Sequence, residues 1–291
     1  MKFAAILVMT LLATTALAVP AAASATNNSS TGTCLTEVPS GSVVLNRTAV
    51  GYPDGSVHVF PTDECLGVEG TPPTISGWLA DAYNDYSSGF SKVTGQWNVD
   101  SAPSNQNDPL IYLFNAMQGD GYIIQPVLTW GCSAYDLLGI CLVGGHYWWA
   151  AAWSVEGSSA TYTQPIQVSQ GDQITGTITW FSSSGGRICG GGSGYTIMID
   201  DVTSGHASQL YLCGSDIGGQ KLTSANVASL EVYRVNSCNQ LPAYGAETFS
   251  DITTNPSFSS WTPSTGSYTP NCAPIVGLWG QPSSVTLEWA T

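Results

Sequence analysis

The chain has 291 residues, of which 9% are Asp, Glu, Lys or Arg, and its formal net charge is −14 at pH 7. With six Lys and Arg against 20 Asp and Glu, it lacks the basic surface that neutralises phosphate, which argues against nucleic acid and anionic membranes as partners. The acidic balance can serve solubility alone, or it can suit an acidic medium, where few groups stay charged once the carboxylates are protonated.

Residues 1–25 have the pattern of a secretory signal peptide. Lys2 precedes an apolar run from Phe3 to Leu17, and small residues offer A-x-A-like cleavage points at 16–18 and 23–25. The run is shorter than the roughly 20 apolar residues of a membrane-spanning helix, and no later segment reaches that length. We therefore expect a secreted, extracellular protein without a membrane anchor.

Residues 26–78 are rich in Ser, Thr, Pro and Gly and predict a small N-terminal extension that could act as a pro-segment. Within it, two β-prone runs at 42–45 and 57–60 flank Asp54-Gly55, a favoured two-residue turn, and predict a hairpin. Three N-x-S/T sequons predict a glycoprotein if the host glycosylates, at Asn27, Asn28 and Asn46.

Residues 79–291 are expected to form a single β-sandwich domain. Short β-prone runs alternate with clusters of Gly, Ser, Pro and Asn, and no window of helical length has a 3.6-residue apolar period. In Val93–Val99 the odd positions apart from Gly95 are apolar, as in a strand with one buried face. The predicted fold class is all-β, with two packed antiparallel sheets. Its clearest strands are 93–99, 110–114, 122–130, 147–155, 173–181, 195–199, 209–213, 229–235, 246–252 and 284–289.

All eight cysteines follow the leader, and an even count in an exported chain predicts four disulfides. No C-x-x-C occurs, which argues against a zinc or redox site, and we expect neither a metal nor a cofactor. Many pairings are possible in principle. We expect neighbouring cysteines to pair, with Cys132 bonded to Cys141 and Cys189 bonded to Cys213.

Familiar catalytic motifs are missing from the sequence. The three histidines are scattered, and no H-E-x-x-H, G-x-S-x-G, P-loop or dinucleotide-binding motif occurs. Carboxylates are left for acid–base chemistry, and Glu231 has the most unusual setting, inside the β-prone run 228–235. Gln125 is a polar amide inside the apolar run 121–130. Alternation could simply point Glu231 to solvent, and Gln125 could be a hydrogen-bonded edge residue beside Pro126, so neither residue is specific alone.

Several segments, taken in order, resemble the glutamic peptidases, the eqolisin family of acid-acting fungal endopeptidases. Residues 92–99 are like the family's K-V-T-G-E-F-T-V strand, and Ile123-Ile124-Gln125 is like the I-L-Q that carries its catalytic Gln. Residues 147–153 and 166–174 are similar to its Y-D-A-W-Y-E-W and I-T-I-S-E-G-D-S-I segments. Residues 230–233 match A-E-W-I around the catalytic Glu, and 241–249 loosely match the next strand.

The resemblance implies a concanavalin-like β-sandwich and an enzyme that hydrolyses peptide bonds by direct attack of water. Glu231 would be the general base that takes a proton from water and then donates it to the leaving amine. Gln125 would hold that water and stabilise the oxyanion, a role that a neutral amide keeps in acid. The expected partner is a polypeptide substrate, and the protein is expected to work at acidic pH as a monomer.

The aromatic run at 147–153 supplies candidates for substrate binding, namely Tyr147, Trp148, Trp149 and Trp153. Because neighbours in a strand face opposite sides, at least one of Trp148 and Trp149 is expected in the core.

Two other functions stay open. One is a catalytically silent sandwich that binds carbohydrate or protein through exposed aromatic residues. The other is a glycoside hydrolase on the same architecture, which needs two facing carboxylates roughly 5 to 10 Å apart. The observation that would best separate these hypotheses is whether Gln125 and Glu231 converge on one water-sized space in an open cleft. Side chains on opposite sheets or opposite faces would end the peptidase hypothesis. The glycosidase hypothesis loses its basis if Glu231 has Gln125, rather than another carboxylate, within hydrogen-bonding reach.

Overall fold

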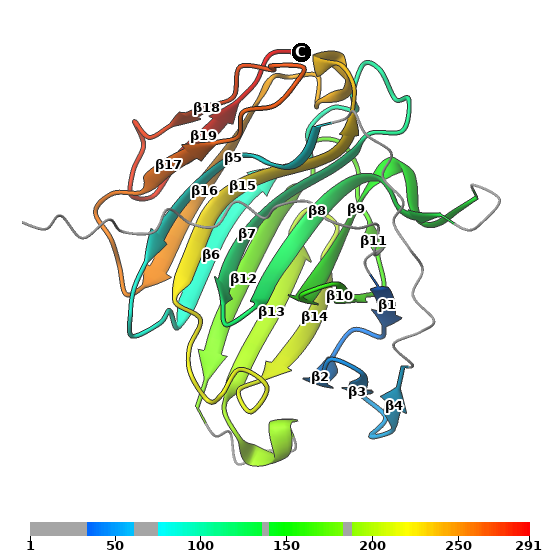
Figure 1. The fold of residues 1–291 in the computed structure, drawn as a ribbon, viewed down its shortest axis with the longest axis vertical. Coiled ribbons are helices and arrows are strands. Elements are labelled where there is room, and N and C mark those ends of the chain that lie inside the picture. Colours follow the sequence, from blue (N-terminus) through cyan, green and yellow to red (C-terminus); the bar gives the residue numbers. More distant parts are fainter. Residues whose placement is uncertain (1–33, 61–74, 136–139, 183–187) are drawn as a thin grey trace, which may run out of the picture. The chain divides into compact units, whose positions relative to one another are not determined.

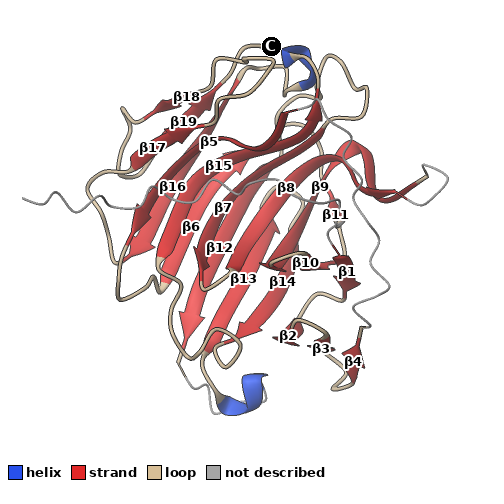
Figure 2. Ribbon diagram, viewed as in Figure 1, coloured by secondary structure: helices blue, strands red, loops and turns tan. Residues whose placement is uncertain are grey.

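A computed structural model describes residues 34–60, 75–135, 140–182 and 188–291 of the chain. These residues lie almost entirely in strands and loops, with two short 3₁₀ helices at Ile188–Gly191 and Cys238–Gln240 (Figure 2). The strands are β1 (Cys34–Val38), β2 (Ser42–Asn46), β3 (Ala49–Gly51), β4 (Val57–Val59), β5 (Ile75–Asp85), β6 (Lys92–Asn98), β7 (Leu110–Gly119), β8 (Tyr122–Tyr135), β9 (Cys141–Glu156), β10 (Ser159–Thr163), β11 (Ile166–Gln167), β12 (Gln173–Phe181), β13 (Gly194–Asp201), β14 (His206–Cys213), β15 (Ser224–Val235), β16 (Ala246–Asn255), β17 (Thr262–Thr265), β18 (Ile275–Gly277) and β19 (Val285–Glu288).

The strands form two sheets that pack face to face (Figure 1). Sheet A has the order β1-β10-β9-β8-β7-β15-β5-β17, with β11 paired to β9. Sheet B has the order β18-β19-β16-β6-β12-β13-β14-β2-β3-β4. Buried apolar side chains of both sheets form one core between them. The predicted all-β sandwich is confirmed, although β1 with β10 and β2 with β14 are parallel pairs.

The period-two pattern of β6 predicted its buried face correctly. Val93 and Trp97 lie in the core between the sheets, whereas Lys92 and Asn98 are exposed. Full burial of such side chains contributes about 1.5 to 3 kcal/mol each, which is what selects the register of this strand. The strands that sequence alternation did not predict are short or contain Gly, Asp or Pro. Hydrogen bonding to neighbouring strands holds these segments in the extended conformation. They are β1, β3, β5, β10, β11, β17 and β18.

The described part of the N-terminal extension adds strands to both sheets. β1 pairs with β10 in sheet A, and β2 pairs with β14 in sheet B. The turn at Asp54-Gly55 joins β3 to β4, so the predicted direct pairing of 42–45 with 57–60 is wrong. β3 lies between these two runs and pairs with both.

The division into leader, extension and sandwich domain stays a prediction. Residues 1–25, Asn27 and Asn28 lie outside the described residues, whereas Asn46 is exposed at the end of β2. β5 runs across the expected boundary between residues 78 and 79 and pairs with β15 along its length.

Disulfides join cysteines that are neighbours in the sequence. The predicted bonds Cys132–Cys141 and Cys189–Cys213 are confirmed, and Cys238 bonds to Cys272. The same rule would pair Cys34 with Cys65, which lies outside the described residues.

Gly176 of β12 marks a point where the two sheets approach closely. A Cβ at this position would lie 2.4 Å from Asn115 Oδ1, 2.6 Å from the Trp97 ring and 2.7 Å from Pro126 Cγ, and Asn115 Nδ2 donates to the Gly176 carbonyl at 3.1 Å. We expect Gly176→Ala to lower the free energy of unfolding by about 1 to 3 kcal/mol, because the added methyl group overpacks the core. Denaturant unfolding measures the change.

The matched control is Gly95→Ala, since Gly95 pairs with Gly176 across β6 and β12 and a Cβ there has no neighbour closer than 3.7 Å. Equal stability of the two variants would contradict the close approach of the sheets at Gly176.

Candidate functional site

The outer face of sheet A, turned away from sheet B, carries the sequence-predicted site residues. Ile124, Leu128, Leu230 and Val232 point into the core between the sheets, so the alternating residues on β8 and β15 point to the outer face. A second apolar cluster lies on this face and includes Phe114, Val127, Trp149, Trp153 and Tyr162.

Strand register arranges the outer face in three rows, each of which crosses β9, β8, β7, β15 and β5 in that order. The first row is Trp153, Gln125, Ala116, Asn226 and Tyr83. The second row is Ala151, Val127, Phe114, Ser229 and Asp81. The third row is Trp149, Thr129, Tyr112, Glu231 and Trp78.

Gln125 lies in the first row with its side-chain oxygen free. The residue is 7% exposed, and Oε1 is buried without a hydrogen-bond partner. Its cross-strand neighbour Trp153 is also buried, and the Trp153 indole N–H has no partner either. A buried donor and a buried acceptor without partners are costly, and both groups can still form a hydrogen bond.

Asn226 lies opposite Gln125 across β7, and both ends of its side-chain amide form hydrogen bonds. Gln118 Nε2 donates to Asn226 Oδ1 at 2.7 Å, and Asn226 Nδ2 donates to Asp81 Oδ2 at 3.0 Å. Ser264 of β17 also bonds to the Asp81 carboxyl group. Burial raises the pKa of Asp81 to about 6, although both bonds oppose the shift.

Glu231 lies in the third row, partly buried among tyrosines. The Tyr233 hydroxyl donates to Glu231 Oε1, and the Tyr112 ring packs against the Tyr233 ring with centroids 6.0 Å apart. Burial raises the pKa of Glu231 to about 7, against the opposing effect of the Tyr233 bond. The carboxyl group is therefore mostly protonated in acid and can both give and take a proton near neutral pH.

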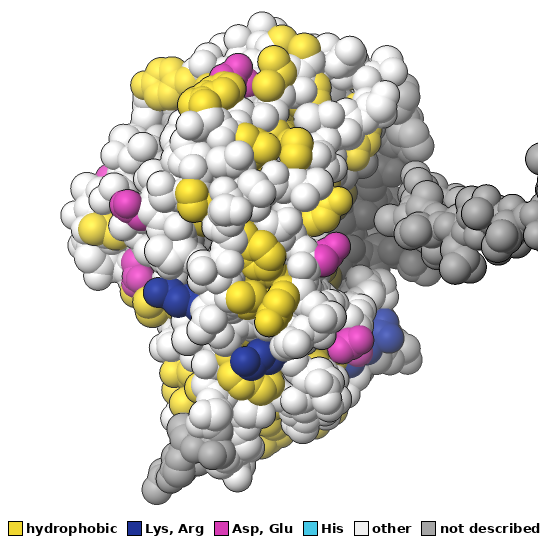
Figure 3. Space-filling view, turned by 90° about the vertical axis from the view of Figure 1, so that its left-hand side faces the viewer, with side chains coloured by type: hydrophobic (Ala, Val, Ile, Leu, Met, Phe, Trp, Pro, Cys, Tyr) yellow, Lys and Arg dark blue, Asp and Glu magenta, His cyan; other side chains and the backbone are white. Residues whose placement is uncertain are grey.

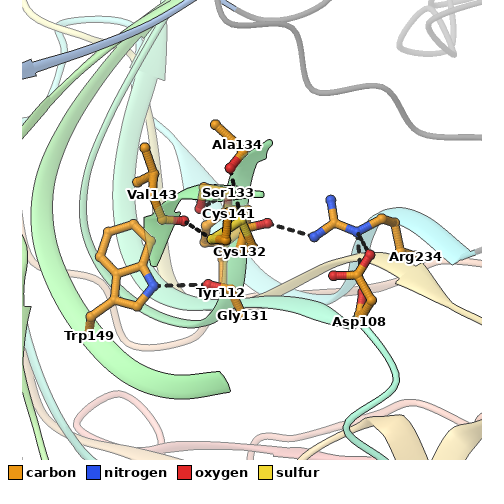
Figure 4. Close-up of a disulfide and its surroundings, with 10 residues drawn as sticks. All are labelled: Asp108, Tyr112, Gly131, Cys132, Ser133, Ala134, Cys141, Val143, Trp149 and Arg234. Carbon is orange, nitrogen blue, oxygen red and sulfur yellow. Dashed lines mark hydrogen bonds and ion pairs between the residues drawn. A yellow bond between two sulfur atoms is a disulfide. The ribbon is translucent and has the colours of Figure 1, made fainter. Parts of the chain in front are cut away.

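Tyr112 and Tyr233 form a tyrosine cluster around Glu231. The Cys132–Cys141 disulfide lies beside this cluster, at the C-terminal end of β8 (Figure 4). Tyr112 Oη and Ser133 Oγ lie 3.0 Å apart, next to the Cys132–Cys141 bond. Arg234 Nη2 donates to the Cys132 carbonyl at 2.6 Å and its Nε lies 3.1 Å from the Asp108 carboxylate. These contacts join β7, β8 and β15 beside Glu231.

Charged residues make up only 9% of the chain. Figure 3 shows one face on which a few Lys, Arg, Asp and Glu side chains are scattered among uncharged and hydrophobic ones. Among the described residues, no group of three or more His, Cys, Asp or Glu is arranged to hold a metal. No helix in the described part of the chain is long and apolar enough to span a membrane.

Comparison with solved structures identifies the fold. Scytalido-glutamic peptidase with a peptide-based transition-state analogue matches 75% of this chain and 100% of its own, with a TM-score of 0.50 and 16% identity. The chain has the glutamic-peptidase fold. SCP-B, a member of the eqolisin family in complex with the tripeptide Ala-Ile-His, matches the same shares at 17% identity with a TM-score of 0.48. No protein-family model and no curated protein matches the chain.

Within the glutamic-peptidase fold of this chain, Gln125 and Glu231 share a face but do not meet. Gln125 is opposite Ala116 and Glu231 is opposite Tyr112, four residues apart along β7. This separates them by about 13 Å along the strands and by two strand spacings of about 4.8 Å across them. The expected convergence of the two side chains on one water is therefore a misprediction.

The aromatic candidates divide between the two faces of β9. Trp148, Trp149 and Trp153 are all buried, at 3%, 0% and 4% exposed, and Trp148 packs on Trp130 in the core between the sheets, away from the outer face. Trp149 and Trp153 lie on the outer face, where Trp149 Nε1 donates to the Gly131 carbonyl at 3.1 Å. Tyr147 is the exposed member of the run. A role in binding stays a prediction for Tyr147, Trp149 and Trp153.

Sequence reasoning did not single out Asp81 or Asn226. Asp81 interrupts the apolar run Leu79-Ala80-Asp81-Ala82 of β5, which is the kind of signal that drew attention to Glu231. Asn226 interrupts the run Ala225-Asn226-Val227-Ala228 of β15 in the same way, but only the strand register places it opposite Gln125.

Proposed function

We propose that this chain is a secreted, extracellular endopeptidase that hydrolyses polypeptides at weakly acidic pH on the outer face of sheet A. The observation that carries the proposal is Glu231, a proton-exchanging carboxyl group on that face of a fold shared with a glutamic peptidase. Below pH 7 this carboxyl group is mostly protonated and can give its proton to the leaving amine.

In this proposal Gln125 binds the substrate backbone away from the bond that is cleaved. An extended peptide rises about 3.3 Å per residue, so the spacing between the first and third rows corresponds to about four substrate residues. The free Gln125 oxygen and the free Trp153 N–H complement the N–H and C=O of a peptide group. This replaces the oxyanion role that the resemblance implied for Gln125.

The test is digestion of a denatured protein between pH 3 and pH 8, with the fragments identified by mass spectrometry. We expect cleavage by the wild type, and for Gln125→Ala a KM about 10-fold higher with little change in kcat, because one backbone hydrogen bond is lost. Gln164→Ala, at an exposed position, is the control. No cleavage at any pH would contradict the proposal.

A catalytically silent binding protein is the second candidate, and Asn226 favours it. The position facing Gln125 holds an amide whose oxygen and nitrogen are both engaged, so no base stands opposite Gln125 in the first row. Peptide or glycan binding that persists in Glu231→Gln, without hydrolysis by the wild type, would support this candidate.

A further inference from the structure

Asp81 is the carboxyl-bearing neighbour of Glu231 on the outer face. Asp81 of β5 is directly opposite Ser229 of β15, and Glu231 follows Ser229 by two residues on the same face. Diagonal neighbours of this kind in an antiparallel pair lie about 7 to 8 Å apart. A register shift in β5 beside Leu230 and Glu231 bends the strand locally between the two carboxyl positions.

Ser229 lies between the two carboxyl groups with an unsatisfied hydroxyl. The residue is fully buried, and Ser229 Oγ has no hydrogen-bond partner. A buried hydroxyl without a partner is rare and costly in proteins. Ser229 Oγ can therefore still form a hydrogen bond beside Asp81 and Glu231.

Tyr268, from the segment after β17, lies close to both carboxyl groups. Its hydroxyl donates to the Trp78 carbonyl at 3.0 Å, over the strand that carries Asp81. Burial raises the pKa of Tyr268, and the charges of Glu231 and of Asp81 raise it further. One ring therefore lies within electrostatic reach of the two groups, in agreement with the strand register.

We propose that Asp81 is a second catalytic carboxyl group and forms an acid–base pair with Glu231. This inference rests on the proposed peptidase function and names the group that first activates water. The Asp81 carboxylate takes a proton from water as the water oxygen bonds to the peptide carbonyl carbon. The C–N bond then breaks as protonated Glu231 gives its proton to the leaving nitrogen, and proton exchange through solvent restores the pair.

The surroundings assign the two roles. Asn226 and Ser264 both donate hydrogen bonds that favour the ionised form of Asp81, whereas Glu231 receives one such bond, from the Tyr233 hydroxyl. The titratable groups that face Glu231 among the described residues are Tyr112, Tyr233 and Tyr268, and Tyr268 also faces Asp81. The positive charge of Arg234 lowers the pKa of Tyr112, against the larger effect of burial. Burial raises the pKa of both carboxyl groups, and the two hydrogen bonds to Asp81 favour this residue as the ionised member of the pair.

The test compares Asp81→Asn with Asp85→Asn, an exposed position on the same strand. Peptide hydrolysis is followed from pH 4 to pH 9. For Asp81→Asn we expect kcat to fall at least 100-fold with KM within about threefold, and the acidic limb of kcat/KM to disappear. Asp85→Asn is expected to match the wild type, and circular dichroism checks that each variant is folded.

A second variant keeps the test decisive if Asp81→Asn does not fold. Ser264→Ala removes a hydrogen bond to the carboxylate, so we expect the acidic limb of kcat/KM to move to higher pH. A folded Asp81→Asn with full activity, or an unmoved limb in Ser264→Ala, overturns the pair and leaves the peptidase proposal intact. Wild-type protein that cleaves no polypeptide, or that cleaves polysaccharide instead, overturns both.

Discussion

Glu231→Gln is expected to lower kcat for peptide hydrolysis by about 10² to 10⁴, the usual contribution of a positioned proton-transfer group. The substitution keeps the shape of the side chain and its acceptor oxygen for the Tyr233 hydroxyl, so the tyrosine cluster is preserved. It removes the proton exchange that a carboxyl group with a pKa of about 7 provides near neutral pH. Initial rates on a fluorogenic peptide, measured from pH 4 to pH 8, give the change in kcat and KM separately.

Glu288→Gln is the matched control for this experiment. Glu288 ends β19 in sheet B, away from the outer face of sheet A, and its substitution is expected to leave kcat unchanged. If Glu231→Gln cleaves peptides as fast as Glu288→Gln does, Glu231 is not the proton-transfer group.

The free energy of unfolding of the wild-type protein is expected to fall as pH rises from 4 to 8, because of Glu247. Burial raises the pKa of Glu247 to about 8, against backbone hydrogen bonds from Asn98 at 3.1 Å and Thr248 at 3.2 Å. A carboxyl group with a raised pKa in the folded state binds its proton more tightly when folded. Its stabilising effect is therefore complete below its ordinary pKa of 4.5 and is lost as pH rises through 8.

Glu247→Gln isolates this effect, because the amide cannot ionise but keeps the oxygen that accepts from Asn98. We expect the stability difference between the variant and the wild type to shift by roughly 3 to 5 kcal/mol in favour of the variant between pH 4 and pH 8, at about 1.4 kcal/mol per pH unit. Urea unfolding at each pH measures it. Parallel pH curves for the two proteins would show that Glu247 ionises freely in the folded state.

The expected gain in stability at low pH agrees with the composition, which is suited to an acidic medium. The few basic groups limit self-repulsion in acid, and Asp81, Glu231 and Glu247 add a reason for the fold to prefer its protonated form. The low charge content thus suits an acidic medium through the folded state as well as through net charge.

Local pattern was enough to predict the fold class and the buried faces of the long strands. In β6, alternation of apolar and polar residues determines which side chains reach the core, because neighbouring residues of a strand point to opposite faces. The same parity determines that Gln125 and Glu231 belong on the outer face, once the core residues beside them are recognised. Disulfides between sequence neighbours were also predictable, since short loops bring those cysteines together.

The register between strands was decided only by the tertiary structure. β7 separates β8 from β15, and its pairing with both places Gln125 opposite Asn226 through Ala116, with Glu231 two rows away. Alternation cannot reveal this, because shifting a strand by two residues leaves every side chain on the same face. Alternation by itself determined that Gln125 and Glu231 lie on the outward faces of their own strands. Which outward-facing residues meet, with Asp81 rather than Gln125 beside Glu231, was decided by long-range pairing among β5, β15, β7 and β8.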